Sequence, residues 1–224
     1  MKKMLFLFII PFVSFSQIIS FELIESYSIN DVQDIYTFSS IPPYAGEINY
    51  AVDGFKIYYY TRDHSGSEVI ASGAIFVPSN SSCPSPIISW QHGTIVSDTS
   101  APSQQINDEN FIGVLAASHG YIVLMSDYLG LGEGDGIHNY CHSETEASSV
   151  IDLIVSSFDF YDSQNIEHNN QLFLMGYSQG GHATLASVRE LEENWEESIS
   201  VTASCPMAGP YSMSEVQSAM LTEL

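Results

Sequence analysis

The stretch Gly176-Tyr177-Ser178-Gln179-Gly180 decides the fold, because a serine lies at its centre with one glycine two residues before it and another two residues after it. An apolar run over 171–175 precedes this stretch, and a helix-like segment over 181–189 follows it. Strand, tight turn and helix in this order form a nucleophile elbow. Such a turn requires glycine at 176 and 180 to avoid steric collision. It would lift the Ser178 hydroxyl above the sheet edge, close to the free N–H groups of the next helix.

The flanking sequence predicts further strands. Residues 55–61 and 68–77 are rich in aromatic and β-branched side chains and are separated by a turn, which predicts an antiparallel hairpin. Two short apolar runs, 87–91 and 121–125, are typical of strands that are buried on both faces. Residues 21–50 show no such pattern and are expected to form an irregular lead-in.

Helices alternate with these strands. One is predicted over 108–119 with Asn107 as its cap, and another begins at the capping box Ser143-Glu144-Thr145-Glu146. The remaining elements are the elbow helix to about residue 195, a strand over 200–205 and a last helix over 214–224. The fold class is therefore α/β, with a mostly parallel sheet and helices on both of its faces.

The composition limits the compartment and the partners. The chain opens with Lys2 and Lys3, an apolar run over 4–13 and small residues up to Ser16, which predicts a signal peptide over 1–16 and a secreted or periplasmic protein. Without this segment, the chain contains three strong bases and 27 acidic residues, so its formal net charge is −24. Such acidity excludes nucleic acid and anionic membrane surfaces as partners. No apolar segment is long enough to predict a transmembrane helix.

Cys83, Cys141 and Cys205 are an odd number of cysteines for an oxidising compartment, so at least one thiol has no partner within this chain. Their spacing does not indicate a metal site. His138 and His142 could bind a metal, but no acidic or cysteine ligand set accompanies them. We therefore expect neither a metal nor a cofactor.

Three motifs together resemble the α/β-hydrolase superfamily. They are His92-Gly93-Thr94 after the third strand, Asp127-Tyr128-Leu129-Gly130-Leu131-Gly132 after the fourth, and residues 176–181 at the elbow. Within the superfamily, the loop over 126–140 and the glutamine after the serine are most similar to the secretory lipase and esterase group. The resemblance covers residues 50–215.

This resemblance implies roles for individual residues. Ser178 would be the nucleophile, and the backbone N–H groups of Gln179 and Thr94 would form the oxyanion hole. Gly93 would allow the Thr94 loop to approach closely. Asp127 would have a structural role, organising the glycine-rich loop.

The triad base and acid depart from the family pattern. In this superfamily both follow the nucleophile in the sequence, yet His182 is the one histidine after Ser178. It would lie on a helix that leads away from the substrate, which favours a surface or packing role, and His92 belongs to the oxyanion turn. We therefore expect residues 17–224 to be the N-terminal part of a catalytic domain, with acid and base beyond residue 224, and the chain alone to be inactive.

The expected function is hydrolysis of carboxylic esters, such as acylglycerols or other apolar esters, by acyl transfer through Ser178. A serine peptidase of the same fold is an alternative, because Gly180-Gly181 after an elbow also suits that group. A non-catalytic protein that has lost the triad is a second alternative. The sequence indicates neither the acyl-chain preference, which separates lipases from esterases, nor the oligomeric state.

Overall fold

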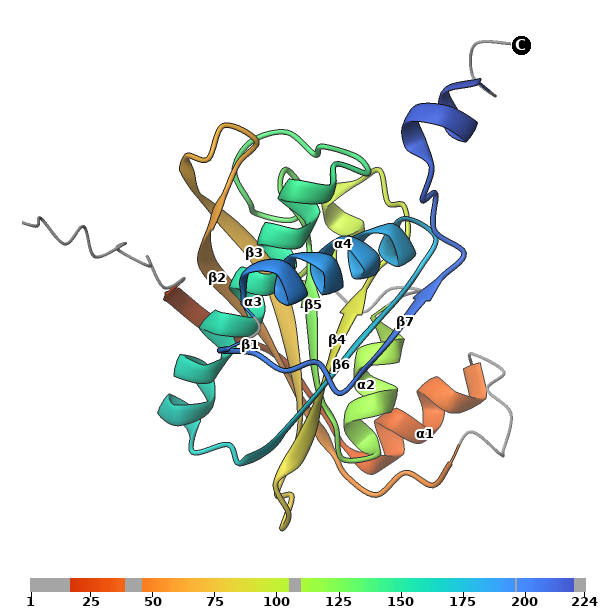
Figure 1. Cartoon of the computed structure of the whole chain (residues 1–224). Helices are drawn as coiled ribbons and strands as arrows, with labels where there is room; N and C mark the ends of the chain where they lie inside the picture. Colours follow the sequence, from red (N-terminus) through yellow and green to blue (C-terminus); the bar gives the residue numbers. More distant parts are fainter. Residues whose placement is uncertain (1–16, 39–45, 105–109, 196, 220–224) are drawn as a thin grey trace, which may run out of the picture.

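A computed structural model describes residues 17–38, 46–104, 110–195 and 197–219. Its centre is a seven-stranded sheet with the order β1-β2-β3-β5-β4-β6-β7 (Figure 1). The strands are β1 (Ile18–Tyr27), β2 (Val52–Arg62), β3 (Glu68–Pro78), β4 (Ser85–Gln91), β5 (Ile122–Ser126), β6 (His168–Tyr177) and β7 (Ala203–Met207).

Strand directions divide the sheet into two parts. Strands β1, β2 and β3 are antiparallel to their neighbours, and β3 also pairs antiparallel with β5. Strand β4 is parallel to β5 and β6, and β6 is parallel to β7. The hairpin of β2 and β3 and the parallel strands that follow are as predicted, so the α/β fold class is confirmed.

Helices cover both faces of the sheet (Figure 1). They are α1 (Ile29–Phe38), α2 (Phe111–Ser118), α3 (Ser143–Gln164) and α4 (Gln179–Asn194), with short turns at Asp98–Ser100 and Met213–Gln217. Helices α3 and α4 bury one set of strand side chains, which includes Ile57 and Leu174. Helices α1 and α2 bury the opposite set, which includes Phe76 and Met125. None of the helices in the described ranges is long and apolar enough to cross a membrane.

The expected irregular lead-in is wrong, because β1 and α1 occupy its first half. Strand β1 lies at the sheet edge with most of its side chains exposed, so it lacks the alternation that marks a half-buried strand. Helix α1 begins at a capping motif in which the Ser28 N–H donates to Asp31 and the Asp31 N–H donates to the Ser28 hydroxyl. It then buries Val32 and Tyr36, one turn apart.

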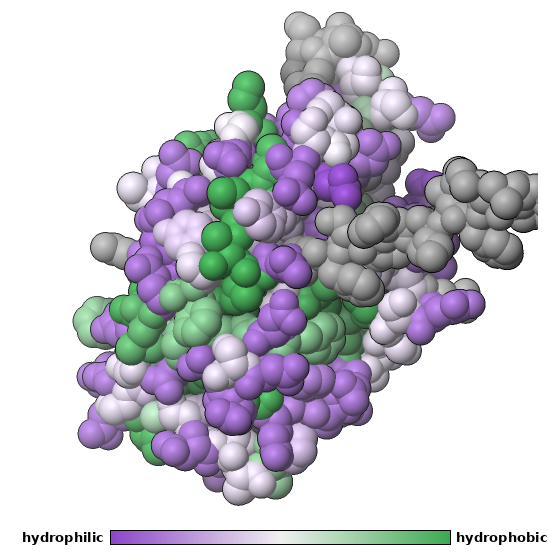
Figure 2. All heavy atoms as spheres, turned by 90° about the vertical axis from the view of Figure 1, so that its left-hand side faces the viewer, coloured by the Kyte–Doolittle hydropathy of each residue, from purple (hydrophilic) through white to green (hydrophobic). Residues whose placement is uncertain are grey.

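The β1 edge leaves apolar side chains on the surface. Ile19, Phe21 and Leu23 are exposed, and the face of the molecule that carries this edge has a band of apolar atoms (Figure 2). The Phe21 ring still packs edge-on against Phe160 of α3, with 5.1 Å between the ring centroids. This contact fixes the edge strand to the core.

The helix boundaries differ in detail from the prediction. Helix α3 starts at Ser143 as expected, but its cap is the His142 side chain, which accepts from the Thr145 N–H, so the capping-box assignment is wrong. Helix α2 starts at Phe111 after Asn110, and the predicted cap Asn107 lies outside the described residues. The last strand is shifted to 203–207. The last helix begins with a π turn at Met213, and residues 220–224 lie outside the described part of the chain.

Candidate active site

Ser178 lies between β6 and α4 in a backbone conformation that non-glycine residues rarely adopt. Its φ is 59° and its ψ is −121°. The turn leaves no room for side chains at its two glycines. A Cβ atom on Gly176 would overlap the carbonyl oxygen of Gly180, and one on Gly180 would overlap the carbonyl oxygen of Gln91. The Gly-x-Ser-x-Gly spacing therefore corresponds to a strained turn that only glycine permits at these two positions.

The Ser178 side chain is half-buried and does not cap α4, although Ser178 occupies the N-cap position. Its backbone N–H donates to the Met207 carbonyl oxygen at 3.0 Å, which joins the elbow to the end of β7. Across the described ranges, no side chain forms a hydrogen bond with its hydroxyl. The hydroxyl is thus available to an incoming group.

The loop over 92–94 lies beside the elbow because β4 and β6 are parallel neighbours. Their register pairs Gln91 with Gly176, so the residues that follow the two strands emerge side by side. Gln179 is the first residue of α4, and its N–H therefore has no acceptor within the helix. In the part of the chain that the structure describes, neither the Gln179 N–H nor the Thr94 N–H donates to a backbone carbonyl. Two such donors at adjoining strand ends can stabilise an oxyanion.

Asp127 anchors the glycine-rich loop that follows β5. Its fully buried carboxylate accepts hydrogen bonds from the Ser72 hydroxyl at 2.5 Å and from the Ser103 N–H at 2.9 Å. Burial raises the pKa of this carboxyl. Gly132 has a φ of +64°, and a Cβ atom there would overlap Oδ2 of Asp127. These contacts support the structural role that the resemblance implied for Asp127.

Tyr128, the next loop residue, contacts the end of β4. It is buried in a left-handed conformation with a φ of 65°. Its hydroxyl donates to the His92 carbonyl oxygen at 3.1 Å, and its ring packs against the His92 ring with 4.3 Å between centroids. On its other side it stacks with His138 at 6.0 Å. Tyr128 therefore joins the oxyanion turn to the end of the glycine-rich loop.

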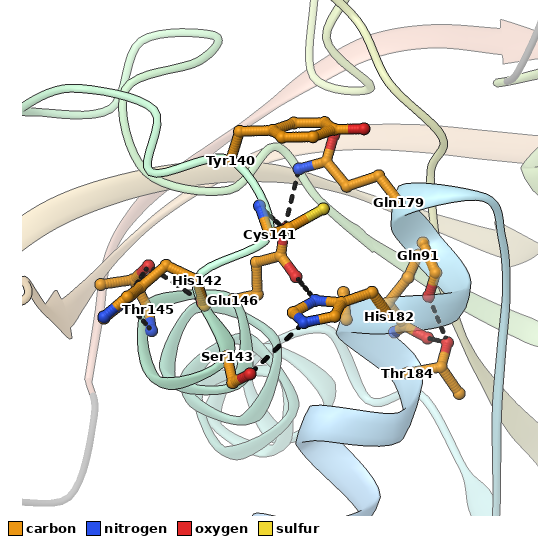
Figure 3. Close-up of polar contacts among 12 residues, drawn as sticks. Gln91, Tyr140, Cys141, His142, Ser143, Thr145, Glu146, Gln179, His182 and Thr184 are labelled. Carbon is orange, nitrogen blue, oxygen red and sulfur yellow. Dashed lines mark hydrogen bonds and ion pairs between the residues drawn. The ribbon is translucent and has the colours of Figure 1, made fainter. Parts of the chain in front are cut away.

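A buried carboxylate on α3, that of Glu146, binds the first turn of α4 (Figure 3). Its Oε1 accepts from the Cys141 N–H at 3.0 Å and from Nε2 of Gln179 at 2.8 Å. Its Oε2 accepts from Nδ1 of His182 at 2.6 Å. Three donors thus compensate for the loss of water around a carboxylate that is 1 % exposed.

His138 contacts the same amide nitrogen of Gln179 that donates to Glu146. The two Nε2 atoms are 2.9 Å apart, and Nδ1 of His138 lies 3.2 Å from the Leu129 carbonyl oxygen. A carbonyl oxygen only accepts, so Nδ1 carries the proton and Nε2 accepts from Gln179. Burial lowers the pKa of His138, which favours this neutral form. The Gln179 side chain is therefore held between Glu146 and His138.

The ring nitrogens of His92 and His182, the two histidines considered as the base, contact groups other than the Ser178 hydroxyl. His182 is buried, with Nδ1 on Glu146 and Nε2 3.3 Å from the Ser143 hydroxyl, at a surface hollow of about 510 Å³ between α3 and α4. The ring nitrogens of His92 lie 2.7 Å from the Gly93 carbonyl oxygen and 3.3 Å from that of Asp127. No histidine in the described residues forms a hydrogen bond with the Ser178 hydroxyl.

Cys141, Glu146 and His182 have potential metal ligand atoms within 4.8 Å of one another. The short bond between His182 and Glu146 satisfies both groups without an ion. Burial raises the pKa of the Cys141 thiol to about 11, whereas a metal binds the thiolate. The geometry therefore favours a hydrogen-bond cluster over a metal site. Cys83 and Cys205 are exposed, and no disulfide joins any of the three cysteines.

Sequence reasoning missed Glu146 and His138 as residues of this region. The capping-box interpretation assigned Glu146 to the helix start and so gave it no role inside the molecule. A signal was available, because Glu146 lies one turn before Val150, on the apolar face of α3. An acidic residue on a buried helical face requires donors, and these come from Cys141, Gln179 and His182.

Comparison with known proteins agrees with the fold and with the motifs. Residues 91–195 match the model of the secretory lipase family. A putative hydrolase from Legionella pneumophila is 30 % identical over 87 % of this chain, with a TM-score of 0.80. The rice cell wall degrading esterase LipA from Xanthomonas oryzae, in a ligand-bound form, is 28 % identical over 88 % of this chain, also with a TM-score of 0.80.

Candida antarctica lipase A shares the fold at 18 % identity, with a TM-score of 0.56 over 84 % of this chain and 41 % of its own length. The chain spans about half the length of the two bacterial structures, 52 % and 51 %. A comparison with curated proteins found no match.

Proposed function

We propose that this chain, which has the α/β-hydrolase fold and matches the secretory lipase family model over residues 91–195, hydrolyses carboxylic esters with Ser178 as the nucleophile. One observation supports the proposal most: the Ser178 hydroxyl has no hydrogen-bond partner among the described residues and lies on a strained turn at the end of β6, next to the end of β4. Such a turn, with glycine required on both sides, is the arrangement that acyl transfer to serine needs.

Hydrolysis would proceed in two acyl-transfer steps. The Ser178 oxygen attacks the ester carbonyl carbon while a base takes the hydroxyl proton, and a tetrahedral intermediate forms. The N–H groups of Gln179 and Thr94 donate to the oxygen that becomes negatively charged. The alcohol leaves with a proton from the base, and water then releases the acid from the acyl-serine.

We place the base and its acid beyond residue 224 in the complete protein, as a proposal. The hydrogen bonds of the histidines support it, because the rings of His92 and His182 have partners other than the Ser178 hydroxyl. A fragment of residues 17–224 should then show no turnover of a p-nitrophenyl ester above its Ser178→Ala control, whereas a chain extended through the next acid and histidine should. Turnover by the fragment that depends on Ser178 would contradict this placement.

The proposed substrates are apolar esters such as acylglycerols, the class that the lipase family implies. We also propose export, on the basis of the sequence of residues 1–16, which lie outside the described residues. Mass spectrometry of secreted material should find a protein that starts near Gln17. An intact Met1 in that material would contradict export by cleavage.

A covalent probe tests the nucleophile directly. In the full-length protein, an organophosphorus ester should label Ser178, and Ser178→Ala should abolish both labelling and ester hydrolysis. Ser143→Ala is the matched control, because Ser143 is an exposed serine whose hydroxyl, unlike that of Ser178, contacts a histidine. Label on another serine, or hydrolysis that survives Ser178→Ala, would refute the proposal.

A further inference from the structure

The two proposed oxyanion donors follow different strands and have no direct bond to each other. Thr94 follows β4 and Gln179 follows β6. Because an oxyanion hole works through donors held in place before the reaction, something must fix the distance between these two N–H groups. The segment over 127–146, which runs from the end of β5 into α3, contacts both sides.

On the Gln179 side, this segment supplies two bonds to one side chain. Gln179 Nε2 donates to Glu146 Oε1 at 2.8 Å and to His138 Nε2 at 2.9 Å. Gln179 is fully buried, so bulk solvent does not reach these bonds. Since Gln179 is the first residue of α4, fixing its side chain also fixes the direction of its backbone N–H.

On the Thr94 side, the same segment supplies Tyr128. Its hydroxyl donates to the His92 carbonyl oxygen at 3.1 Å, two residues before Thr94. The Tyr128 ring stacks on His138, with ring planes 12° apart, so the two sides share a contact inside the segment. Tyr140 adds a second contact, since its hydroxyl lies 3.1 Å from that of Thr94.

We propose that Glu146 and Tyr128 are positioning residues of the oxyanion hole, and that the segment over 127–146 is a brace that sets the spacing between the Gln179 and Thr94 N–H groups. The proposal rests on the proposed function. Neither side chain takes part in bond making. Glu146 acts through the Gln179 side chain, and Tyr128 acts through the His92 carbonyl.

The brace is tested by substitutions at Glu146 in the full-length protein. Glu146→Gln keeps an oxygen for Gln179 and Cys141, and its amide N–H can donate to Nδ1 of His182 once that ring moves its proton to Nε2. We expect its kcat to stay within about threefold of the wild type. Glu146→Leu removes every acceptor, and should lower kcat by about 10–100-fold with little change in KM, since a displaced oxyanion donor acts on the transition state.

Tyr128→Phe is the second variant, because it keeps the ring that stacks on His138 and removes the hydroxyl that donates to the His92 carbonyl oxygen. It should fold normally, as judged by its urea unfolding midpoint, and lower kcat by about 3–10-fold at constant KM. Binding of a trifluoromethyl ketone, which mimics the oxyanion, should weaken in parallel with kcat in Glu146→Leu and Tyr128→Phe.

The outcomes separate this inference from the proposed function. If Ser178→Ala abolishes turnover but Glu146→Leu and Tyr128→Phe retain wild-type kcat and inhibitor affinity, the brace is wrong and the function stands. If Ser178→Ala retains turnover, the function itself fails. A loss in Glu146→Leu that appears in KM alone, or that Glu146→Gln shares in full, would also overturn the positioning role.

Discussion

Gly180 lies so close to the carbonyl oxygen of Gln91 that no Cβ atom fits between them. This contact holds the start of α4 against the end of β4, and it predicts the effect of the smallest substitution. Gly180→Ala should destabilise the protein by about 1–3 kcal/mol and abolish labelling of Ser178, because β4 and the elbow would have to separate. Urea unfolding and labelling with an organophosphorus ester measure the two effects.

The matched control is Gly66→Asn in the turn between β2 and β3. Gly66 has a φ of +78° with no atom near its missing Cβ, and asparagine tolerates this conformation. Labelling should remain at the wild-type level. If both substitutions lowered the stability and the labelling of Ser178 equally, the effect of Gly180→Ala would be general and not a property of the elbow.

His182 provides a test of the triad base. Its Nδ1 donates to Glu146, and a glutamine at this position can donate the same bond. We therefore expect His182→Gln to retain activity within about tenfold of the wild type, whereas loss of a triad histidine removes several orders of magnitude. Steady-state hydrolysis of a p-nitrophenyl ester decides between the two. A drop of 10⁴-fold in a folded variant would identify His182 as the base after all.

The carboxyl group of Asp152 in α3 should make the stability of the folded protein depend on pH. Burial raises the pKa of this carboxyl group to about 6, from an ordinary value of 3.8. The folded protein then keeps a proton that the unfolded chain loses between about pH 4 and pH 6, so the Asp152 contribution to stability falls as pH rises through this window. Asp152→Asn should remove this fall, which amounts to on the order of 3 kcal/mol.

Urea unfolding at pH 4 and pH 7 measures this difference. The control is Asp159→Asn, an exposed residue of the same helix, which should follow the wild-type pH dependence. Identical curves for Asp152→Asn and the wild type would contradict the prediction.

The burial of Cys141 leads to a prediction about how the thiols of this protein react with alkylating reagents. Burial raises the pKa of Cys141 to about 11, so little thiolate exists at pH 8, and the residue is buried in the folded protein. Iodoacetamide should leave Cys141 unmodified in the native protein and modify it after unfolding in urea, as peptide mass spectrometry can show. The exposed Cys83 serves as the internal control. Rapid native alkylation of Cys141 would mean that the Glu146 cluster opens in solution.

The succession of central strands and helices along the chain, and the elbow, could be predicted from the sequence, because buried parallel strands are short apolar runs and Gly-x-Ser-x-Gly has few geometric solutions. Strand β1 could not, since an exposed edge strand has no hydrophobic alternation. The Glu146 cluster was also missed. Its members lie at 138, 141, 146, 179 and 182, and only the packing of α3 on α4 brings them together.

The elbow serine also affects how stable the fold can be. Ser178 stands at the N-cap of α4 without capping it, and capping side chains contribute about 0.5–2 kcal/mol. Its left-handed backbone costs a further 1–3 kcal/mol or so. A glycine at this position would relieve the strain and remove the hydroxyl. Serine at position 178 therefore favours reactivity and lowers stability. If folding stability alone determined the residue at this position, glycine would be preferred to serine.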